Sequence, residues 1–450
     1  MSVSEGPSGK NDFYLNSLDK FLTDTHTIYA ENDDTTSLAS MARSFQENNQ
    51  LFFLYGCGSN QHNQLLLDRP NNAACLNGED AHEKKESILC TVRQNGLDQP
   101  KAIYAGGGHS GLLTESGKLF LFGWHDDGQC GTSGFEPNDN ASIPVVRPLT
   151  NIDVEEAALG FSHTLVIEKG TNRLFAFGNN ERGQVNGKPS ASETLPTTPE
   201  FLKEDKVQYV AAGLFHSAVI TREGELITFG CGRFGQSLST KMNANDQVWS
   251  AMRWRPDDNS RLVDVACGRR HTVAVDEKGR VWSFGENKYG QLGRTTKGKT
   301  DSTPVLVDGL KDIPEGSRAR ICCGWSHSVL QVELPGGENA FYGWGRNDKG
   351  QLGTGNSDPV SEPTLLFQNK NFRSVACGSE STVAIDGDDK IWGCGWNEHG
   401  NLATGCKTDK LKMTKTLGAK VVGPPGLHDG MTVIAAGGAH FFATKVSLQK

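Results

Sequence analysis

Six histidines recur at one position of a repeated motif, and histidine is the side chain whose charge changes most readily near neutral pH. They are His109, His163, His216, His271, His327 and His440. An acid–base or metal site is one interpretation, but one site could not use six equivalent residues from successive units. We therefore expect a structural role, in which each imidazole bonds a neighbouring backbone group after a glycine turn. We accordingly predict no catalytic residue, no metal and no cofactor.

These histidines belong to the first of two signatures that alternate from residue 51 onward. The first signature is small-Gly-x-x-His-Ser/Thr, as in Cys267-Gly-Arg-Arg-His271-Thr, and its copies follow one another at intervals of 54, 53, 55, 56, 54 and 59 residues. Two copies are degenerate, Cys377-Gly-Ser-Glu-Ser381-Thr and Ala436-Gly-Gly-Ala-His440-Phe. The second signature is an aromatic residue or cysteine, Gly, and a polar turn that usually ends in Gly-Gln. A regular period of this length indicates a repeat architecture.

Between the two signatures, apolar and polar residues alternate on both sides of a charged turn. In one copy, the segments 272–276 and 280–284 flank the turn 277–279, which is the pattern of a β-hairpin. Such a small antiparallel sheet cannot bury both faces by itself, whereas seven sheets around an axis can. The sequence predicts an all-β, seven-bladed β-propeller over residues 51–450. Because the chain begins with the second half of a unit and ends with the first half, we expect residues 51–58 to pair with residues 440–446.

Composition excludes several classes of function. The net charge of −8 argues against direct nucleic-acid binding, which needs an excess of cations. The longest compact apolar run, residues 51–55, is far shorter than the ~20 residues of a membrane span. Eleven cysteines without a Cys-x-x-Cys pair favour neither a disulfide framework nor a zinc ribbon. We expect a monomeric cytoplasmic protein without a signal peptide, with the nucleus as a second compartment.

Both signatures, at this period and in seven copies, resemble the repeats of the regulator-of-chromosome-condensation family. The resemblance covers nearly all of the chain after residue 50 and implies a seven-bladed β-propeller. It leaves function open, since family members include a guanine-nucleotide exchange factor, a plant UV-B photoreceptor, inhibitors and scaffolds. Only Gly324-Trp325-Ser-His327 fits the Gly-Trp-x-His copies of the photoreceptor, so we do not expect photoreception.

Segments at residues 55–60, 395–401 and 435–440 look like those of two cytosolic subgroups of this family. The first is the alpha-tubulin-suppressor type, an accessory of diphthamide synthesis and Elongator-dependent tRNA modification that partners a small zinc-ribbon electron carrier. This resemblance implies a non-enzymatic, protein-binding propeller. The second is the secretion-regulating type, which implies the alternative function of a guanine-nucleotide exchange factor for a small GTPase, without covalent chemistry.

Candidate partner-binding residues lie in the loops that carry the two signatures, at the end of each hairpin opposite its polar tip. They are Trp124, Phe161, Leu214, Phe215, Arg269, Arg270, Trp325 and Trp396. Aromatic and arginine side chains in exposed loops are the usual composition of interface hot spots. The alternative is that these side chains are partly buried against neighbouring loops.

Two segments depart from the repeats. Residues 1–50 carry three Lys or Arg against eight Asp or Glu, which predicts a flexible acidic tail. Residues 67–99 are predicted to form an extended loop, and loops of that length in a compact fold are commonly functional or disordered. In an exchange factor, such a loop can act as the wedge that displaces the nucleotide.

Overall fold

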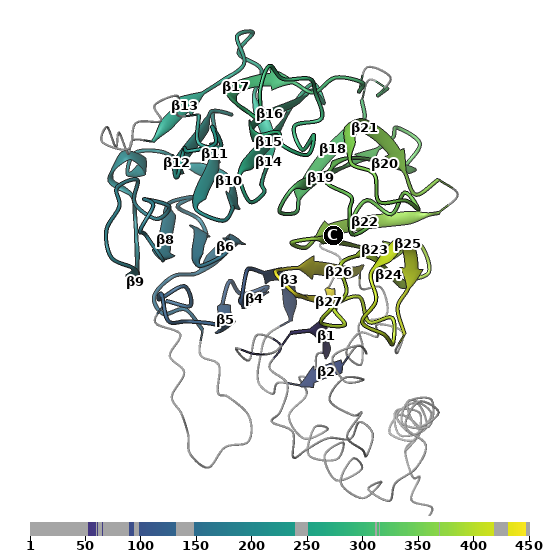
Figure 1. Ribbon diagram of the computed structural model, residues 1–450. Coiled ribbons are helices and arrows are strands. Elements are labelled where there is room, and N and C mark those ends of the chain that lie inside the picture. Colours follow the sequence, from purple (N-terminus) through teal and green to yellow (C-terminus); the bar gives the residue numbers. More distant parts are fainter. Residues whose placement is uncertain are drawn as a thin grey trace, which may run out of the picture.

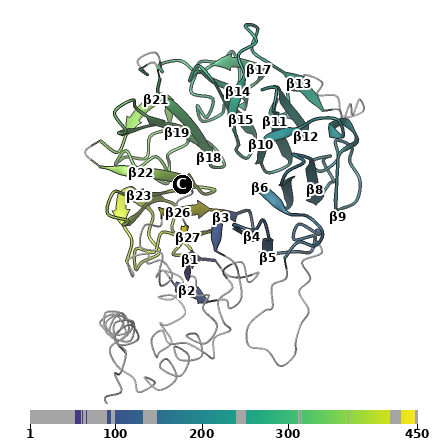
Figure 2. The ribbon, with the colours of Figure 1, turned by 180° about the vertical axis from the view of Figure 1, so that it is seen from behind.

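Seven small antiparallel sheets lie around one axis, as Figures 1 and 2 show from opposite sides. This computed structural model describes residues 53–59, 61, 65, 90–93, 99–131, 148–238, 251–310, 313–314, 316–368, 370–417 and 431–446. Within these ranges the chain is an all-β, seven-bladed propeller, as the sequence predicts. Only a short 3-10 helix, Glu200–Leu202, interrupts the described strands and loops.

We number the blades in chain order from the first histidine signature. Blade 1 contains β3 (Pro100–Ala105), β4 (His109–Thr114) and β5 (Leu119–Gly123); blade 2 contains β6 (Val154–Leu159), β7 (His163–Glu168), β8 (Leu174–Gly178) and β9 (Glu193–Thr197); blade 3 contains β10 (Val207–Ala212), β11 (His216–Thr221), β12 (Leu226–Gly230) and β13 (Met252–Trp254). Blade 4 contains β14 (Leu262–Cys267), β15 (His271–Asp276), β16 (Val281–Glu286) and β17 (Thr300–Leu306); blade 5 contains β18 (Arg318–Cys323), β19 (His327–Glu333), β20 (Asn339–Gly345) and β21 (Val360–Leu366); blade 6 contains β22 (Phe372–Cys377), β23 (Ser381–Asp386), β24 (Ile391–Gly395) and β25 (Lys410–Lys415). Blade 7 contains β26 (Met431–Ala436), β27 (His440–Val446), β1 (Phe53–Gly58) and β2 (Cys90–Arg93).

Blade 7 joins the two parts of the chain that lie furthest apart in sequence. The predicted pairing is confirmed: β1 runs antiparallel to β27, with Leu54 opposite Thr444 and Gly58 opposite His440. Because side chains alternate between the two faces of a strand, a slip of one residue would turn every buried side chain of β1 to the wrong face. The register is therefore fixed by packing on both sides of the blade.

Neighbouring residues of β27 fill the two junctions of blade 7. Phe441 packs beside Val383 of blade 6, whereas Phe442 packs beside Ile103 and Phe122 of blade 1. The rings of Phe122 and Phe442 meet edge to face, with their centroids 6.1 Å apart. Both faces of each sheet are thus buried only when its two neighbours are present, which explains why the fold closes into a ring.

The structure changes the interpretation of one predicted loop. Within residues 67–99, Cys90–Arg93 form β2, which pairs with β1 as the outer strand of blade 7. Most other residues of that segment, and the predicted acidic tail at residues 1–50, lie outside the described residues. No helix in the described ranges is long and apolar enough to cross a membrane.

Replacing Phe442 by alanine tests the closure of the ring. Phe442 is 1% exposed, so we expect Phe442→Ala to lower the free energy of unfolding by about 3–5 kcal/mol, from lost burial and the remaining cavity. Leu195→Ala on β9 is the control, since Leu195 is 58% exposed and should change stability by less than about 0.5 kcal/mol. Urea unfolding followed by circular dichroism measures both. Equal effects from the two substitutions would contradict this account of closure.

Candidate functional site

Both signatures meet at one end of every blade, as the sequence predicts. The residue after the glycine of the second signature donates its backbone N–H to the second x residue of Gly-x-x-His: Glu286 to the carbonyl of Arg270 at 2.7 Å, and Trp396 to the carbonyl of Glu380 at 2.8 Å. This close approach needs a glycine. Gly285 has a φ of 117°, and a Cβ there would lie 2.5 Å from the carbonyl oxygen of Arg270. We call this side of the ring the Gly-x-x-His end.

The signature histidines hydrogen-bond across the junctions between blades. Each is buried, and its Nε2 lies between 2.9 and 3.1 Å from a hydroxyl oxygen of the following blade. The pairs are His109–Thr164, His163–Ser217, His216–Thr272, His271–Ser328, His327–Thr382 and His440–Ser110. The expected structural role is confirmed, but the expected backbone partner is wrong, because the partner is a side chain of the next repeat.

The hydroxyl groups define which imidazole nitrogen carries the proton. Thr272, for example, donates its single hydroxyl proton to the backbone carbonyl of Gln236 at 2.9 Å. The same oxygen must therefore accept a hydrogen bond from His216, so Nε2 of the imidazole is the protonated nitrogen. At five of the six histidine junctions, the hydroxyl in turn donates to the carbonyl of the glutamine that ends the second signature.

Burial keeps these imidazoles neutral. Desolvation lowers the pKa from 6.5 to about 3 for His109, His163, His216 and His271, and to about 4 for His327 and His440. A buried imidazole that remains neutral and bonded across a junction is not placed to exchange protons with a ligand. Among the described residues, no group of three or more His, Cys, Asp or Glu is placed to hold a metal ion.

The junction between blades 6 and 7 replaces the polar pair by an apolar contact. Ser381 stands where the other copies have histidine, and Phe441 stands where they have Ser or Thr. Phe441 is 1% exposed and packs beside Val383. Both partners change together, so no buried imidazole is left without its hydroxyl at this junction. A buried polar group without a partner would cost roughly 1–3 kcal/mol.

The first x residues of the Gly-x-x-His loops surround the axis and line a cavity of about 90 Å³. Backbone hydrogen bonds link these loops from blade to blade, as between Trp325 N–H and the carbonyl of Ser379 at 2.8 Å. From the predicted set, the structure brings four side chains together around this cavity. They are Phe161, Leu214, Arg269 and Trp325.

The predicted partner-binding side chains are less exposed than expected. Leu214 is buried at 9% exposure, and the other seven are half-buried. Trp124 is joined to the cavity group through Phe161, since their rings meet edge to face with centroids 6.0 Å apart. Trp396 instead packs against His399 of its own turn, at 5.1 Å between ring centroids. Partial burial against neighbouring loops is therefore the rule at this end.

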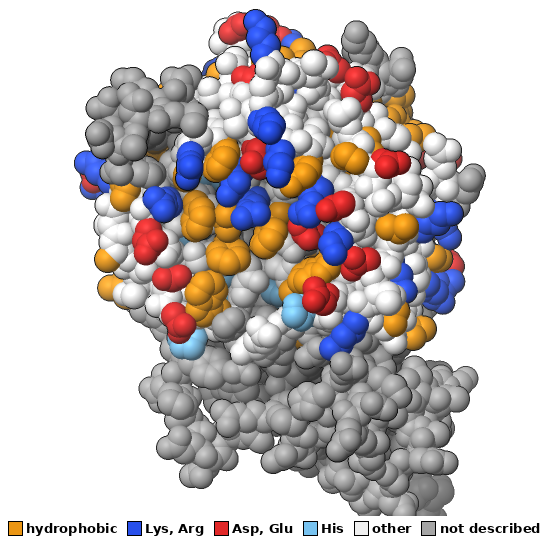
Figure 3. All heavy atoms as spheres, in the orientation of Figure 1, with side chains coloured by type: hydrophobic (Ala, Val, Ile, Leu, Met, Phe, Trp, Pro, Cys, Tyr) orange, Lys and Arg blue, Asp and Glu red, His pale blue; other side chains and the backbone are white. Residues whose placement is uncertain are grey.

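At the Gly-x-x-His end, three arginines of blades 4 and 5 lie over an aromatic ring of a neighbouring blade. Their guanidinium carbons are 5.1 Å from the ring centroid for Arg269 over Trp325, 4.1 Å for Arg270 over Phe234 and 5.2 Å for Arg346 over Tyr289. We call these six residues the arginine–aromatic patch. Such contacts hold a cation against an apolar surface. Figure 3 shows hydrophobic and basic side chains gathered around the middle of this face.

Sequence reasoning missed three members of the patch. Phe234 and Tyr289 both precede the last Gly-Gln of the second signature, and Arg346 follows the first glycine of that signature. The sequence did contain a signal for them. These positions of the second signature vary between repeats, as do the x positions of the first signature from which the candidate residues were chosen. Arg346 also pairs with Asp348 at 2.7 Å and with Glu380.

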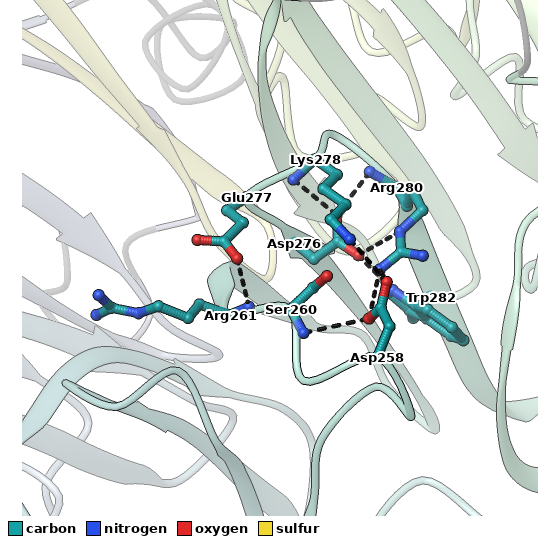
Figure 4. A network of polar contacts seen from close by, with 8 residues as sticks. All are labelled: Asp258, Ser260, Arg261, Asp276, Glu277, Lys278, Arg280 and Trp282. Carbon is teal, nitrogen blue, oxygen red and sulfur yellow. Dashed lines mark hydrogen bonds and ion pairs between the residues drawn. The ribbon is translucent and has the colours of Figure 1, made fainter.

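The hairpin tips at the opposite end of the ring balance their own charges (Figure 4). Asp258 accepts hydrogen bonds from Arg280 at 3.0 Å and from Lys278 at 2.8 Å, which together hold the pKa of that carboxyl below its usual range. Asp276 accepts from Arg280 at 2.7 Å and from Trp282 at 3.1 Å. The ion pairs of Asp258 are screened by water and add little to stability, whereas the Asp276 carboxylate is buried beneath Arg280. These tips are suited to contact with water.

Comparison with known proteins agrees with this architecture. The sequence matches the RCC1-like domain over residues 53–443, and the chain belongs to that family. The crystal structure of Prp20p from Saccharomyces cerevisiae, described with its binding to Gsp1p and histones, superposes with a TM-score of 0.68 at 18% identity, covering 91% of this chain and 95% of that one. That similarity supports the fold alone.

Sequence relatives include exchange-factor and regulatory proteins. The secretion-regulating guanine nucleotide exchange factor of Mus musculus is 29% identical over 388 residues, which are 79% of this chain and 76% of the relative. The ultraviolet-B receptor UVR8 of Arabidopsis thaliana is 26% identical over 359 residues, 78% of each chain. The protein is thus an RCC1-like propeller related to proteins of both kinds.

Removing one buried histidine should change how stability depends on pH. The pKa of His271 is about 3 in the folded chain and 6.5 when unfolded. Below pH 6.5 the unfolded chain binds a proton that the folded chain does not bind. The contribution of this imidazole to the free energy of unfolding is therefore complete above pH 6.5 and is lost as the pH falls toward 3. The loss is about 1.4 kcal/mol for each pH unit. His271→Gln keeps an N–H donor but cannot titrate, so proton uptake on unfolding should fall by about one.

The slope of unfolding free energy against pH, from urea titrations below pH 6.5, measures this uptake. Phe442→Ala is the control, because it lowers stability without removing a titratable group and should leave the slope unchanged. An unchanged slope in His271→Gln would contradict the assignment of a neutral buried imidazole.

Proposed function

We propose that this protein is a non-enzymatic binding propeller, that the Gly-x-x-His end holds a protein partner, and that the partner is a small GTPase whose nucleotide exchange the propeller promotes. The arginine–aromatic patch is the observation that carries the proposal. Arginine and aromatic side chains are enriched among residues that dominate binding energy, and a cavity mouth beside them offers a concave contact. The similarity to a secretion-regulating exchange factor supports the choice of partner.

The charges of the patch favour a partner surface with carboxylates near its centre. Arg270 lies 3.4 Å from Glu286, and Arg346 is paired with Asp348 and Glu380. Arg269 takes part in none of the ion pairs found among the described residues, and its charge lies at the rim of the cavity over Trp325. An unpaired guanidinium on an aromatic face gains most when a carboxylate reaches it in a dry interface.

Nucleotide exchange needs differential binding rather than covalent chemistry. A propeller that binds the nucleotide-free form of a GTPase more tightly than the nucleotide-bound form shifts that equilibrium toward release. No buried histidine has to titrate in such a mechanism. The alternative partner is the small zinc-ribbon electron carrier of the alpha-tubulin-suppressor type, in which case the propeller acts as an accessory subunit and nucleotide is not involved.

Truncation of the patch should weaken partner binding without unfolding the ring. We expect Trp325→Ala and Arg269→Ala each to weaken affinity by about thirtyfold, which corresponds to ~2 kcal/mol for the loss of an anchoring side chain. Calorimetric titration with the captured partner measures affinity, and the melting temperature controls for folding. The matched controls at the opposite end are Glu223→Ala and Lys118→Ala, whose exposed side chains should change affinity by less than about threefold. Equal losses of affinity from substitutions at both ends would contradict the assignment of the Gly-x-x-His end as the binding face.

The identity of the partner is tested by capture followed by an exchange assay. The full chain is immobilised, and bound proteins are identified by mass spectrometry with the Trp325→Ala chain as the control. A captured GTPase is loaded with fluorescent GDP, and release is followed with and without the propeller. We expect faster release with the unmodified chain than with Trp325→Ala. Recovery of a zinc-ribbon protein in place of a GTPase, or release that the propeller does not accelerate, would contradict the exchange function.

A further inference from the structure

Two cysteines from adjacent blades approach each other beside the axis. Cys322 lies on β18 of blade 5 and Cys377 on β22 of blade 6, and their sulfur atoms are 3.0 Å apart. Both thiols are free and half-buried. A disulfide has an S–S distance of about 2.0 Å, so a closing movement of about 1 Å would suffice.

The repeats show that this pair is a property of one junction. Cys322 and Cys377 occupy fixed positions of the inner strands, and the residues at the same two positions lie in one hydrophobic cluster at every junction. At the other six junctions the equivalent pairs are Tyr104–Leu159, Ala158–Ala212, Ala211–Cys267, Ala266–Cys323, Ala376–Ala436 and Ala435–Ala105. Among the seven junctions, cysteine therefore occupies both positions only between blades 5 and 6.

We propose that Cys322 and Cys377 form a redox modification site, at which hydrogen peroxide closes a reversible disulfide between blades 5 and 6. Cys377 lines the central cavity, through which a small peroxide can approach this residue. The hydrogen bond with Cys377 and burial raise the pKa of the Cys322 thiol well above its ordinary value. Because Cys377 lines the cavity and Cys322 does not, Cys377 meets the peroxide first, and Cys322 resolves the product.

The chemistry balances with peroxide as the oxidant. The Cys377 sulfur attacks one peroxide oxygen, the O–O bond breaks, and the hydroxide that leaves takes up the proton of the Cys377 thiol to form water. The Cys322 sulfur then attacks the sulfur of the resulting sulfenic acid, the S–O bond breaks and a second water leaves. Two thiols lose two electrons and two protons, and one peroxide becomes two waters. A dithiol reductant reverses the bond by exchange.

The disulfide would fix the base of the loops that carry Trp325 and Ser379. These loops already share a backbone hydrogen bond of 2.8 Å, directly beyond the two cysteines in sequence. The bond would join two cysteines that are 55 positions apart in sequence, which restricts the unfolded chain. Oxidation should therefore raise the melting temperature. This inference does not depend on the identity of the partner.

The test uses the full chain treated with hydrogen peroxide under native conditions and then blocked with an alkylating agent. Peptide mapping without reductant should find the peptides of Cys322 and Cys377 joined, with the loss of two free thiols, and dithiothreitol should restore both. We expect the joined peptide to disappear in Cys322→Ala and in Cys377→Ala. Alanine occupies the same positions in other blades, so both variants retain a residue that the repeat accommodates.

Cys267→Ala is the matched control, because Cys267 lines the same cavity but faces an alanine across its junction. The joined peptide and the rise in melting temperature should persist in that variant. Absence of the joined peptide in the unmodified chain, when other cysteines are oxidised, would overturn the proposal. Persistence of the rise in melting temperature in Cys322→Ala would also overturn it, because that rise would then come from another site.

Discussion

A hydrogen bond between the imidazole of one blade and a hydroxyl of the next is the interaction on which the ring depends at six of its seven junctions. A single bond of this kind contributes only ~1 kcal/mol, but an unpaired buried partner would cost more than the bond contributes. The bond therefore does more than add stability. It sets the position of each blade relative to the next, which we call the stagger of the blades. Where one junction lacks the imidazole, it also lacks the hydroxyl, and Phe441 fills the space. At that junction the imidazole and the hydroxyl are thus lost together.

Because the histidines and glycines are occupied with holding the ring, the residues between them are free to differ from blade to blade. The first x position is Gly107 in blade 1, Arg269 in blade 4 and Trp325 in blade 5, although the surrounding backbone is the same. A symmetric scaffold thus presents an asymmetric surface. The arginine–aromatic patch lies on blades 3 to 5 only. A partner that binds the patch would therefore contact one side of the Gly-x-x-His end.

Periodicity made most of the fold predictable, since two signatures in a constant order define hairpins, blade number and the pairing of β1 with β27. The partner of each histidine was wrongly expected to be a backbone group, although a Ser or Thr follows the histidine in most copies. That hydroxyl serves the imidazole of the preceding repeat, and only the stagger between blades shows it. The burial of Leu214 and the stacking of Arg270 on Phe234 depend on the same stagger. Contacts within a repeat could be predicted, whereas contacts between repeats could not.

The contacts that build the patch all cross junctions. Arg270 of blade 4 lies on Phe234 of blade 3, and Arg269 of blade 4 lies on Trp325 of blade 5. Their side chains are held before a partner arrives, so less rotamer entropy is lost on binding. The geometry of the surface then depends on blade stagger, which the buried imidazole bonds set. Since the sulfur atoms of Cys322 and Cys377 meet across the junction next to Trp325, a covalent bond there would act on the same stagger. Closure of the ring, shape of the surface and chemistry of the thiols are thus consequences of how adjacent blades are aligned.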